Sequence, residues 1–293
     1  MTPADTPSMS RQNLIEDFSL EMTGKDVQAL HEARDFIPQG TKINVTFLGN
    51  EDLEMRIAAA KAVRDLGFRP VPHVSARRLE SVAQLEEFLD RLRQVGASDH
   101  IFSVGGDPEK PQGPFPDSLT VIESGLLAKY GVENVSIAGY PEGHPDISDE
   151  VLWSFLKNKD TVLKEQGVGC TLITQFGFDA QLMTNWVTKV REAGIDSQIR
   201  IGTPGPASIK RLLNFARRFG VGANTMIAKK YGFSLMNLVG TAGPEKFVTA
   251  LEDAQAKNPD LGDLKLHFYA FGGLAATAQW VDNYGATKHG TRA

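Results

Sequence analysis

Residues 171–202, TLITQFGFDAQLMTNWVTKVREAGIDSQIRIG, contain one strand–helix–strand unit. Residues 171–176 and 198–202 are short, largely apolar runs of the kind found in strands that are buried on both faces. Between them, residues 180–193 have apolar side chains at helical spacing, and Gly194 follows as a residue typical of helix ends. The stretch therefore predicts two strands of one sheet, connected by a helix that packs across it.

The same alternation extends outward from this unit along most of the chain. Strand patterns and helix patterns follow one another, and a glycine closes most of the helices. The expected strands are residues 18–22, 43–48, 70–75, 101–104, 135–140, 171–176, 198–202 and 264–271. The expected helices are residues 25–36, 53–66, 82–95, 118–130, 149–166, 180–193, 207–219, 245–256 and 274–284.

Eight strand–helix pairs in 293 residues predict an α/β fold, a single (β/α)8 TIM barrel over residues 14–285. A short helical insertion is expected within residues 222–244, before the last strand. Residues 1–13 and 286–293 lack periodicity, so we expect a disordered N-terminal tail and a C-terminal tail. A doubly wound open sheet would use the same alternation, but the first turn has no G-x-G-x-x-G motif, which favours the barrel.

Composition and charge exclude several classes of protein. Apolar residues make up 41% and charged residues 23% of the chain, as in globular proteins that bury a substantial core. No stretch approaches the ~20 apolar residues of a membrane span, and a net charge of −5 disfavours nucleic acid as a partner. The polar N-terminus lacks the apolar block of a secretory signal, so we expect a cytoplasmic protein. The single cysteine, Cys170, cannot form an internal disulfide, and we expect it in the core.

Polar side chains follow the expected strands at the end where TIM barrels carry their active sites. Because the carboxyl ends of all the strands meet at one rim, side chains from distant parts of the chain are expected to share a site. The histidines have no H-x-H or H-E-x-x-H spacing, so no metal site is expected. No lysine occupies a strand end, which argues against a Schiff-base mechanism. The strand-end residues are Glu21, Thr46, His73, Asp107, Tyr140, Glu142, His144, Gln175 and Tyr269.

Alternation within the first expected strand singles out Glu21. Apolar residues occupy positions 18, 20 and 22, which leaves Ser19 and Glu21 on the face that points into the barrel lumen. Burial there would raise the pKa of the Glu21 carboxyl, as a general acid requires. The structural alternative is a carboxylate that stabilises the start of the following helix.

Other strand-end residues also have structural interpretations. His73 and His144 fit equally well as hydrogen-bonded structural histidines, and Asp107 fits as a turn residue after two glycines. Gln175 is harder to explain in this way, because a buried side-chain amide needs hydrogen-bond partners.

Six stretches at these strand ends resemble the methylenetetrahydrofolate reductase family. They occur in the family's order between about residues 15 and 284, and the pair formed by YPEGHP and ITQFGFD is specific. The resemblance implies a bacterial-type flavoprotein, catalytic barrel only, in which FAD takes a hydride from NADH or NADPH and passes it to a folate-bound methylene group. The stretches are PHVSA (72–76), GGDPEKPQGPF (105–115), IAGYPEGHPD (137–146), TLITQFGFD (171–179), GIDSQIRIGTPGP (194–206) and LHFYAFG (266–272).

The resemblance also implies roles for individual residues. Glu21 corresponds to the acid that protonates N10 of the folate and opens its imidazolidine ring. Asp107 corresponds to the aspartate beside the flavin and the pterin, so it is the second catalytic residue. The implied cofactor-binding residues are Thr46, His73, Gly106, Asp107, Tyr140 and His144, with Lys159 preferred over Lys157 and Lys164 for the flavin phosphates. The implied substrate-binding residues are Gln175, Phe178 and Tyr269.

The chain departs from the family pattern at positions that bear on how tightly FAD is bound and on how the folate's glutamate tail is held. We therefore interpret the chain as a divergent branch of the family. Gly105-Gly106-Asp107 stands where the family has arginine-glycine-aspartate. Gly272-Gly273 replaces an asparagine–arginine pair.

The leading hypothesis is the flavin-dependent reduction of 5,10-methylenetetrahydrofolate to 5-methyltetrahydrofolate by NADH or NADPH, in either physiological direction. One alternative is the same folate reaction by direct hydride transfer from NADH, without flavin. A second is a lyase or isomerase barrel that binds a phosphate at glycines within residues 202–205 and 272–273. A third is a non-catalytic folate-binding protein. A homo-oligomer is a further hypothesis, because apolar residues gather in the expected insertion: Met226, Ile227, Phe233, Leu235 and Met236.

Overall fold

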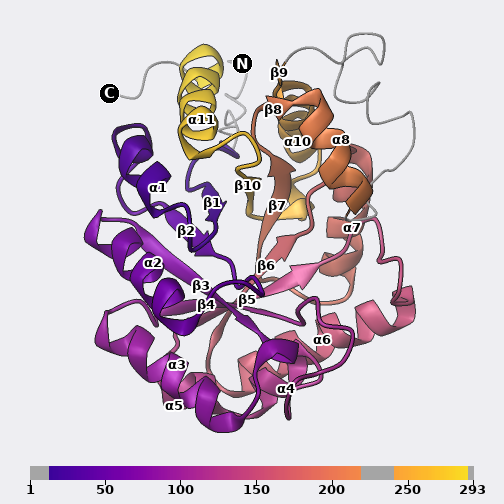
Figure 1. The fold of residues 1–293 in the computed structure, drawn as a ribbon. Helices are drawn as coiled ribbons and strands as arrows, with labels where there is room; N and C mark the ends of the chain where they lie inside the picture. Colours follow the sequence, from indigo (N-terminus) through magenta and orange to yellow (C-terminus); the bar gives the residue numbers. More distant parts are fainter. Residues whose placement is uncertain (1–12, 219–240, 290–293) are drawn as a thin grey trace, which may run out of the picture.

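Eight parallel strands close into a barrel at the centre of the molecule (Figure 1). In the order in which they pair, the strands are β1 (Ser19–Met22), β10 (Leu264–Tyr269), β7 (Gln198–Pro204), β6 (Gly169–Thr174), β5 (Asn134–Gly139), β4 (His100–Val104), β3 (Arg69–Ser75) and β2 (Lys42–Val45). β1 pairs with both β2 and β10, which closes the ring. This computed structural model describes residues 13–218 and 241–289. The expected TIM barrel is confirmed.

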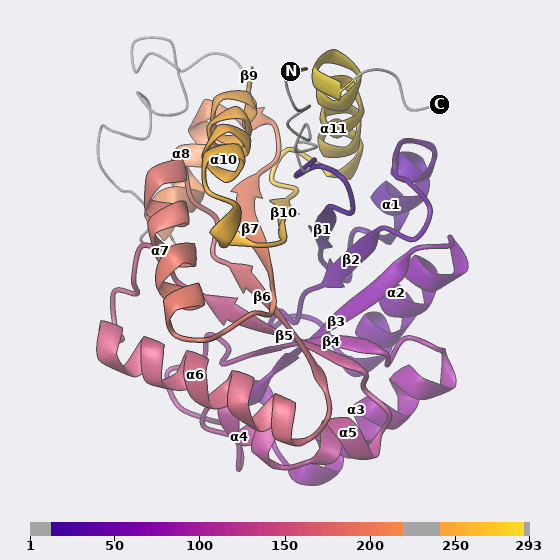
Figure 2. The same cartoon turned by 180° about the vertical axis from the view of Figure 1, so that it is seen from behind.

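Helices form a layer around the outside of the barrel, as the two opposite views show (Figures 1 and 2). In the part of the chain that the structure describes, three short 3-10 turns accompany them, at Arg34–Phe36, Ala76–Arg78 and Pro259–Leu261. The helices are α1 (Val27–Ala33), α2 (Leu53–Asp65), α3 (Val82–Gln94), α4 (Ser118–Glu123), α5 (Leu126–Lys129), α6 (Asp149–Glu165), α7 (Ala180–Glu192), α8 (Ile209–Arg218), α10 (Glu245–Lys257) and α11 (Leu274–His289).

Local sequence explains where several helices begin and end. The Asp52 side chain accepts a hydrogen bond from the Met55 backbone N–H at 2.8 Å, which caps the start of α2. After α2 the chain turns at Gly67, whose φ of +85° is a left-handed conformation that other residues rarely adopt. Asp52 thus marks the connection from β2 into α2, and Gly67 marks the return from α2 to β3.

Three helices differ from the sequence expectation. The helix expected over residues 118–130 is split into α4 and α5, because Gly125 adopts a left-handed φ of +68° between them. The helix expected over residues 25–36 stops being α-helical at Ala33 and continues as a 3-10 turn. α11 runs to His289, past the boundary that was expected at residue 285.

Smaller differences concern strand ends and the expected insertion. β2 ends at Val45 and β6 at Thr174, so Thr46 and Gln175 lie just beyond their strands. A two-stranded antiparallel sheet of β8 (Ala207–Ser208) and β9 (Thr241–Ala242) was not expected. Most of the expected insertion, including the apolar residues considered for a homo-oligomer, lies outside the described residues, as does most of the expected N-terminal tail.

The barrel lumen contains an apolar cluster and, at the amino ends of the strands, a group of ion pairs that forms its floor. Val71, Phe102 and Ile173 form the apolar cluster. Toward the amino ends of the strands, Arg200 is only 1% exposed and donates to the Asp17 carboxylate, as does Lys42. With the floor closed by these ion pairs, the carboxyl ends of the strands are left as the place for a ligand.

Two further features bear on chemistry and location. Cys170 packs against the hydrophobic core, as expected, and burial raises the pKa of its thiol to about 12, so it stays protonated near neutral pH. Among the helices that the structure describes, none has the length and apolar character needed to cross a bilayer.

Candidate active site

Glu21 lies in the barrel lumen, on the face of β1 that alternation predicts. Its Oε2 atom lies 3.7 Å from Nε2 of His73 on β3 and 3.6 Å from Nε2 of His267 on β10. Because β3 does not pair with β1, the contact with His73 crosses the lumen. The Glu21 side chain is 19% exposed, so the carboxylate is largely enclosed.

His267 is fully buried, and Ser19 holds its ring in place. Its Nδ1 atom lies 2.9 Å from Ser19 Oγ, and the same hydroxyl lies 3.5 Å from the Leu266 carbonyl oxygen. Its Nε2 atom is buried and has no hydrogen-bond partner within the described residues. An unpaired buried ring nitrogen is uncommon in proteins, and this one faces Glu21.

His73 has different surroundings, although it approaches the same carboxylate oxygen. Its Nε2 atom lies 3.5 Å from Asn44 Nδ2, and its ring stands edge-on to Phe102 at a centroid distance of 4.7 Å. Burial lowers the pKa of His73 to about 4, although the charge of Glu21 acts in the opposite direction. The His73 ring is therefore neutral near pH 7.

The expectation of a raised pKa for Glu21 is wrong. Burial is the largest single influence and does raise the pKa. The contact with His267, and the charges that His73 and His267 carry when protonated, together outweigh burial and lower the pKa below its ordinary value. The expectation considered burial alone and left out two histidines that come from other strands.

Tyr269 forms one wall of this site. Its hydroxyl donates to the Thr174 carbonyl oxygen at 3.1 Å, and its ring stands edge-on to His267 at 4.9 Å. Burial raises the pKa of Tyr269 well above its ordinary value, and the charge of Glu21 adds to this effect. Gly202 on β7 leaves room for the ring, because a Cβ atom there would lie 2.9 Å from it.

Gln175 and Phe178 both lie in the loop after β6, but they lie at different places on the barrel. The Gln175 backbone N–H donates to the Gly139 carbonyl oxygen at 2.8 Å, which keeps this residue at the strand ends. Phe178 is buried and lines a groove between α7 and α10, on the outside of the barrel. Of these two residues, which were expected to bind substrate together with Tyr269, the structure brings only Gln175 to the rim.

Asp107 lies in the loop after β4 and is ion-paired with Arg78. Arg78 Nε and Nη2 donate to Asp107 Oδ1 at 2.9 and 2.5 Å. The Arg78 side chain is 15% exposed and that of Asp107 is 75% exposed, so a fixed arginine holds an outward-facing carboxylate. The guanidinium packs on Gly49, where a Cβ atom would lie 2.5 Å from it.

Thr46 and Gly106 lie at the ends of β2 and β4. The Thr46 hydroxyl is buried and lacks a hydrogen-bond partner in the part of the chain that the structure describes. Gly106 has a φ of +93°, and a Cβ atom there would lie 2.3 Å from Ser75 Oγ. Gly105 faces open space, since a Cβ atom there would meet nothing within 4 Å. An unsatisfied hydroxyl and an uncrowded backbone suit the polar edge of a planar ligand.

Tyr140 and His144 meet in the loop after β5. Their rings are edge-on at a centroid distance of 5.5 Å. His144 Nδ1 accepts a hydrogen bond from the Asp146 backbone N–H at 3.1 Å. Burial raises the pKa of Tyr140, so its hydroxyl stays protonated and can donate to a ligand.

Lys159 is buried within the helix layer. Its ammonium lies 5.8 Å from the centre of the Phe155 ring. Burial lowers the pKa of Lys159 to about 8, and the charge of Asp117 opposes that shift. The structure does not bring this residue together with Glu21 and the histidines.

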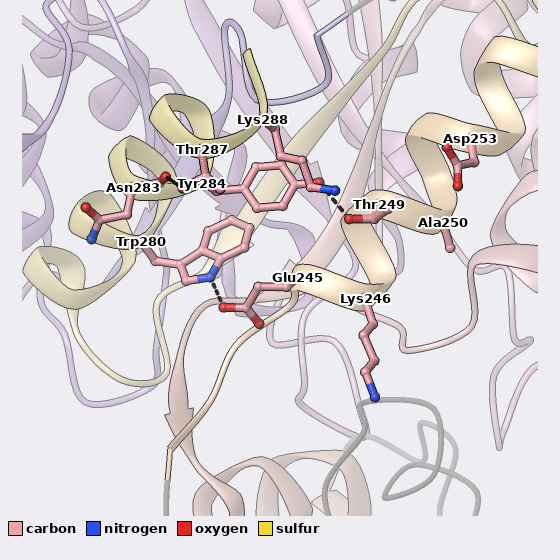
Figure 3. Close-up of a pocket in the computed structure, with 10 residues that line it drawn as sticks. All are labelled: Glu245, Lys246, Thr249, Ala250, Asp253, Trp280, Asn283, Tyr284, Thr287 and Lys288. Atoms are coloured by element: carbon pink, nitrogen blue, oxygen red, sulfur yellow. Dashed lines mark hydrogen bonds between the residues drawn. The ribbon is translucent and has the colours of Figure 1, made fainter. Parts of the chain in front are cut away.

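A separate groove of about 700 Å³ lies between α10 and α11 (Figure 3). Trp280 and Tyr284 of α11 stack at 5.0 Å, and Trp280 Nε1 donates to the Glu245 carboxylate. The groove is lined by residues of these two outer helices and by none of the predicted site residues. The candidate active site is therefore the group of polar side chains at the strand ends.

Two other kinds of site find no support in residues 13–218 and 241–289. No group of three His, Cys, Asp or Glu side chains in these ranges is arranged to hold a metal ion. The glycines considered for phosphate binding are mostly packed against protein atoms. A Cβ atom at Gly205 would lie 2.3 Å from Thr277 Oγ1, and one at Gly272 would lie 1.8 Å from the Pro206 carbonyl oxygen. These glycines allow close packing.

Sequence reasoning missed His267, Asn44 and Arg78. Alternation could have found the first two, because His267 shares a face of its strand with Tyr269, and Asn44 lies two residues before Thr46. Arg78 had no such signal, since it lies in a 3-10 turn after β3. Its role depends on the position of the Asp107 carboxylate, which the loop after β4 brings to it.

A comparison with protein families identifies the chain. The model of the family described as "Methylenetetrahydrofolate reductase" matches residues 17–231, a range that begins before β1 and ends after β7. The chain belongs to the methylenetetrahydrofolate reductase family. The match confirms the resemblance seen at the strand ends, and in this methylenetetrahydrofolate reductase family member it includes Glu21, His73 and Asp107.

Individual methylenetetrahydrofolate reductases are distant relatives. "Methylenetetrahydrofolate reductase 2" of Saccharomyces cerevisiae is 28% identical over 55% of this chain and 27% of its own length. "Methylenetetrahydrofolate reductase (NADH) 1" of Arabidopsis thaliana is 26% identical over 47% of this chain and 25% of its own length. "5,10-methylenetetrahydrofolate reductase" of Pectobacterium carotovorum is 28% identical over 59% of this chain and 57% of its own length. The match thus spans about a quarter of the two eukaryotic relatives and just over half of the bacterial one.

Among solved structures, the dihydropteroate synthase of Thermus thermophilus has a similar fold. The two superpose with a TM-score of 0.51 over 94% of this chain and 95% of the other, at 16% sequence identity. At that identity the likeness shows the barrel fold of this methylenetetrahydrofolate reductase family member and nothing about its chemistry.

Proposed function

We propose that the protein reduces 5,10-methylenetetrahydrofolate to 5-methyltetrahydrofolate, with NADH or NADPH as the reductant and FAD as the bound hydride carrier. The observation that carries this proposal is the enclosed Glu21 carboxylate, which meets two histidines inside a barrel of this family. A carboxyl group in such a place can give one proton to a nitrogen of the substrate with little competition from bulk water.

The ends of β2, β4 and β5 offer groups that suit a flavin. The buried Thr46 hydroxyl has no partner among the described residues and would find one on the polar edge of the flavin ring. Open space at Gly105 leaves room for that ring. When bound, FAD supplies the hydride transfer between the nicotinamide and the folate. The residues proposed to hold it are Thr46, His73, Gly106, Asp107, Tyr140 and His144.

Glu21 supplies the proton that opens the folate ring. Its carboxyl donates to N10, which leaves the methylene carbon able to accept a hydride. The exposed Asp107 carboxylate, held by Arg78, stabilises the positive charge that develops on the substrate. Gln175 and Tyr269 position the pterin, and the hydrogen bond from the Tyr269 hydroxyl to the Thr174 carbonyl oxygen holds the tyrosine ring in place.

The visible absorption spectrum of the purified protein and its turnover test this function. We expect flavin bands close to one FAD per chain, and NAD(P)H-dependent formation of 5-methyltetrahydrofolate by the same preparation. Supplementing with FAD before the assay controls for loss of cofactor during purification. A flavin-loaded protein that converts the folate in neither direction contradicts the proposal.

Two observations favour a second candidate, direct hydride transfer from NADH to the folate without flavin. Gly105 carries no side chain toward the open space beside it, and Lys159 is buried in the helix layer instead of reaching the rim. Gly105 stands where the family has an arginine, a departure that concerns FAD binding, and Lys159 was expected to meet the flavin phosphates. A colourless protein that does not retain added FAD, yet forms 5-methyltetrahydrofolate from NADH, would decide for this candidate.

A further inference from the structure

The loop that carries Asp107 is long and has no helix or strand of its own. It spans residues 105–117, between the end of β4 and the start of α4. Connections of this length are uncommon within compact domains, and an ordered one needs contacts that hold its backbone. Arg77 and Arg78, in the 3-10 turn that follows the neighbouring strand β3, supply such contacts.

Arg77 contacts this loop at both ends and in the middle. Its Nε atom donates to the Pro116 carbonyl oxygen at 2.8 Å, and its Nη1 atom donates to the Pro108 carbonyl oxygen at 3.4 Å. Its backbone N–H donates to the Gly105 carbonyl oxygen at 2.9 Å, and its own carbonyl oxygen accepts from the Gln112 backbone N–H at 2.8 Å. A single residue thus pairs with polar backbone groups along most of a loop that has no regular hydrogen-bond pattern of its own.

The loop also lies directly on the chain that leaves the 3-10 turn. A Cβ atom at Gly113 would lie 2.4 Å from the Glu80 carbonyl oxygen and 2.5 Å from the Leu79 carbonyl oxygen. Only glycine permits so close an approach of the two backbones. The position of the loop is therefore set by the turn beside it.

Arg78 holds the Asp107 side chain by one of its two oxygens. Its Nε and Nη2 atoms both donate to Asp107 Oδ1, at 2.9 and 2.5 Å. Oδ2 remains an acceptor on a side chain that is 75% exposed. Two donors from one planar guanidinium on the same oxygen also fix the direction of the other oxygen, which a point charge would not do.

The guanidinium of Arg78 rests in turn on the loop after β2. A Cβ atom at Gly49 would lie 2.5 Å from Arg78 Nη1, and the centre of the Phe47 ring lies 6.0 Å from Arg78 Cζ. Arg56 packs on the same Phe47 ring at 3.5 Å and on the Phe88 ring at 4.7 Å. The Arg78 side chain is therefore only 15% exposed, although it lies at the rim of the barrel.

We propose that Arg77 and Arg78 position Asp107 for the folate step: Arg77 fixes the loop, and Arg78 turns the carboxylate so that Oδ2 is presented to the substrate. This inference rests on the proposed function and deepens it. Both arginines act through Asp107 and are positioning residues. With Oδ1 occupied, Asp107 offers Oδ2 as its acceptor, which suits one N–H group at the edge of the pterin.

The orientation and the charge of Arg78 have opposite effects on the folate step. By charge alone, a guanidinium beside Asp107 weakens the stabilisation that this carboxylate gives to a developing positive charge. Removal of Arg78 would then make the folate step faster. Under our proposal the orientation of the carboxylate matters more, so removal of Arg78 makes the step slower.

Three substitutions separate orientation from charge. Arg78→Met removes both the charge and the hydrogen bonds, whereas Arg78→Lys keeps the charge but lacks the two-donor fork. Gly49→Ala leaves both members of the ion pair in place and displaces the guanidinium, which can move because it ends a flexible side chain. We expect kcat for folate reduction to fall ~10-fold or more in all three, because small displacements of a catalytic group slow a reaction strongly. The KM for NADH should stay within a few-fold.

A double-mutant cycle shows whether this effect passes through Asp107. Arg78→Lys should slow the wild-type protein, but it should change the rate by less than ~2-fold when Asp107 has already been replaced by Asn. Arg93→Met is the matched control and should leave kcat unchanged, because Arg93 pairs with Asp90 on the surface at 59% exposure. A faster folate step in Arg78→Met overturns the proposal, as do losses that multiply fully in the cycle.

Amide hydrogen exchange in the loop provides a readout that needs no turnover. Arg77→Met removes the side-chain bonds to both ends of the loop, and it should speed exchange of the Gln112 N–H by ~10-fold or more and lower kcat. Arg78→Lys should leave that exchange within a few-fold of wild type. Unchanged exchange in Arg77→Met overturns the role of Arg77.

Turnover of the wild-type protein separates this inference from the proposed function. If the wild-type protein converts no folate, both fail together. If it converts folate and the kcat values of Arg78→Lys and Gly49→Ala equal that of wild type, the inference fails and the proposed function stands.

Discussion

The two carboxylates of the site differ in exposure and hence in the chemistry available to each. Glu21 is 19% exposed and surrounded by ring nitrogens, whereas Asp107 is 75% exposed and held by an arginine. An enclosed carboxyl group is placed to exchange a proton with a substrate that fills the lumen above it. An exposed carboxylate in an ion pair is suited to act through its charge.

Glu21→Gln should separate the two halves of the reaction. The amide keeps the size and hydrogen bonding of the carboxyl group but has no proton to transfer. We expect folate reduction to fall by ~10²-fold or more, because loss of general acid catalysis typically costs ~10²–10⁴-fold. Transfer of a hydride from NADH to the flavin, followed with a quinone acceptor, should stay within a few-fold.

Both rates are to be measured on one flavin-loaded preparation, so that misfolding cannot imitate the result. An equal loss in both half-reactions would show that Glu21 is structural. Normal folate turnover in the variant would place the acid elsewhere, with Glu142 as the next residue to test.

At the scale of strands and helices, the barrel and its lumen-facing carboxylate were predictable, but the electrostatics around that carboxylate were not. Alternation in a strand depends only on local sequence, so it correctly placed Ser19 and Glu21. The pKa of Glu21 depends on His73 and His267, which approach it only after β3 and β10 have taken their places. The break between α4 and α5 escaped prediction because one glycine conformation overrides a continuous apolar pattern.

Gly202→Ala should destabilise the barrel wall next to the site. The added Cβ atom would lie 2.4 Å from the Thr174 carbonyl oxygen and 2.9 Å from the Tyr269 ring, so β6 or the ring must move. We expect a loss of ~1–3 kcal/mol in the free energy of unfolding, as for other overpacked sites. Gly105→Ala is the matched control, because its Cβ atom would meet nothing within 4 Å. Equal urea midpoints for the two variants would show that the strand end shifts without cost.

At the scale of the whole molecule, ion pairs close the floor of the barrel and a polar site occupies its opposite end. Asp17 Oδ2 accepts from Arg200 Nη2 at 2.6 Å, and its Oδ1 accepts from Lys42 Nζ at 2.7 Å. One carboxylate thus separates two cations from different strands. Removing it leaves an arginine that is 1% exposed without its counter-ion.

Asp17→Asn should therefore destabilise the protein, by ~1–3 kcal/mol, a value below that for fully buried pairs because the Asp17 side chain is 39% exposed. Burial raises the pKa of Asp17, but Arg200 and Lys42 outweigh it, and the pKa lies below the ordinary value of 3.8. The carboxylate thus stabilises the fold fully at pH values well above 3.8, and this contribution is lost as the pH falls through the lower folded pKa.

Urea unfolding of wild type and Asp17→Asn at pH 7 and at acid pH measures this effect. The difference between the two proteins should shrink as the pH falls below 3.8. Asp35→Asn is the control, because Asp35 pairs with Arg34 on the surface at 80% exposure. A difference that persists undiminished in acid would mean that the asparagine acts through packing and not through charge.

Closure of the barrel through β1 and β10 has a consequence for how the protein is made. Ser19 and His267 are 248 positions apart, yet their hydrogen bond lies within one pair of neighbouring strands. During synthesis, Glu21 leaves the ribosome among the first strands, and His267 follows only when nearly all of the barrel has been translated. A nascent chain therefore carries Glu21 before it has the His267 ring that lies beside this carboxylate in the finished barrel. The surroundings of Glu21 are therefore completed in one late event, when the last strand docks against the first.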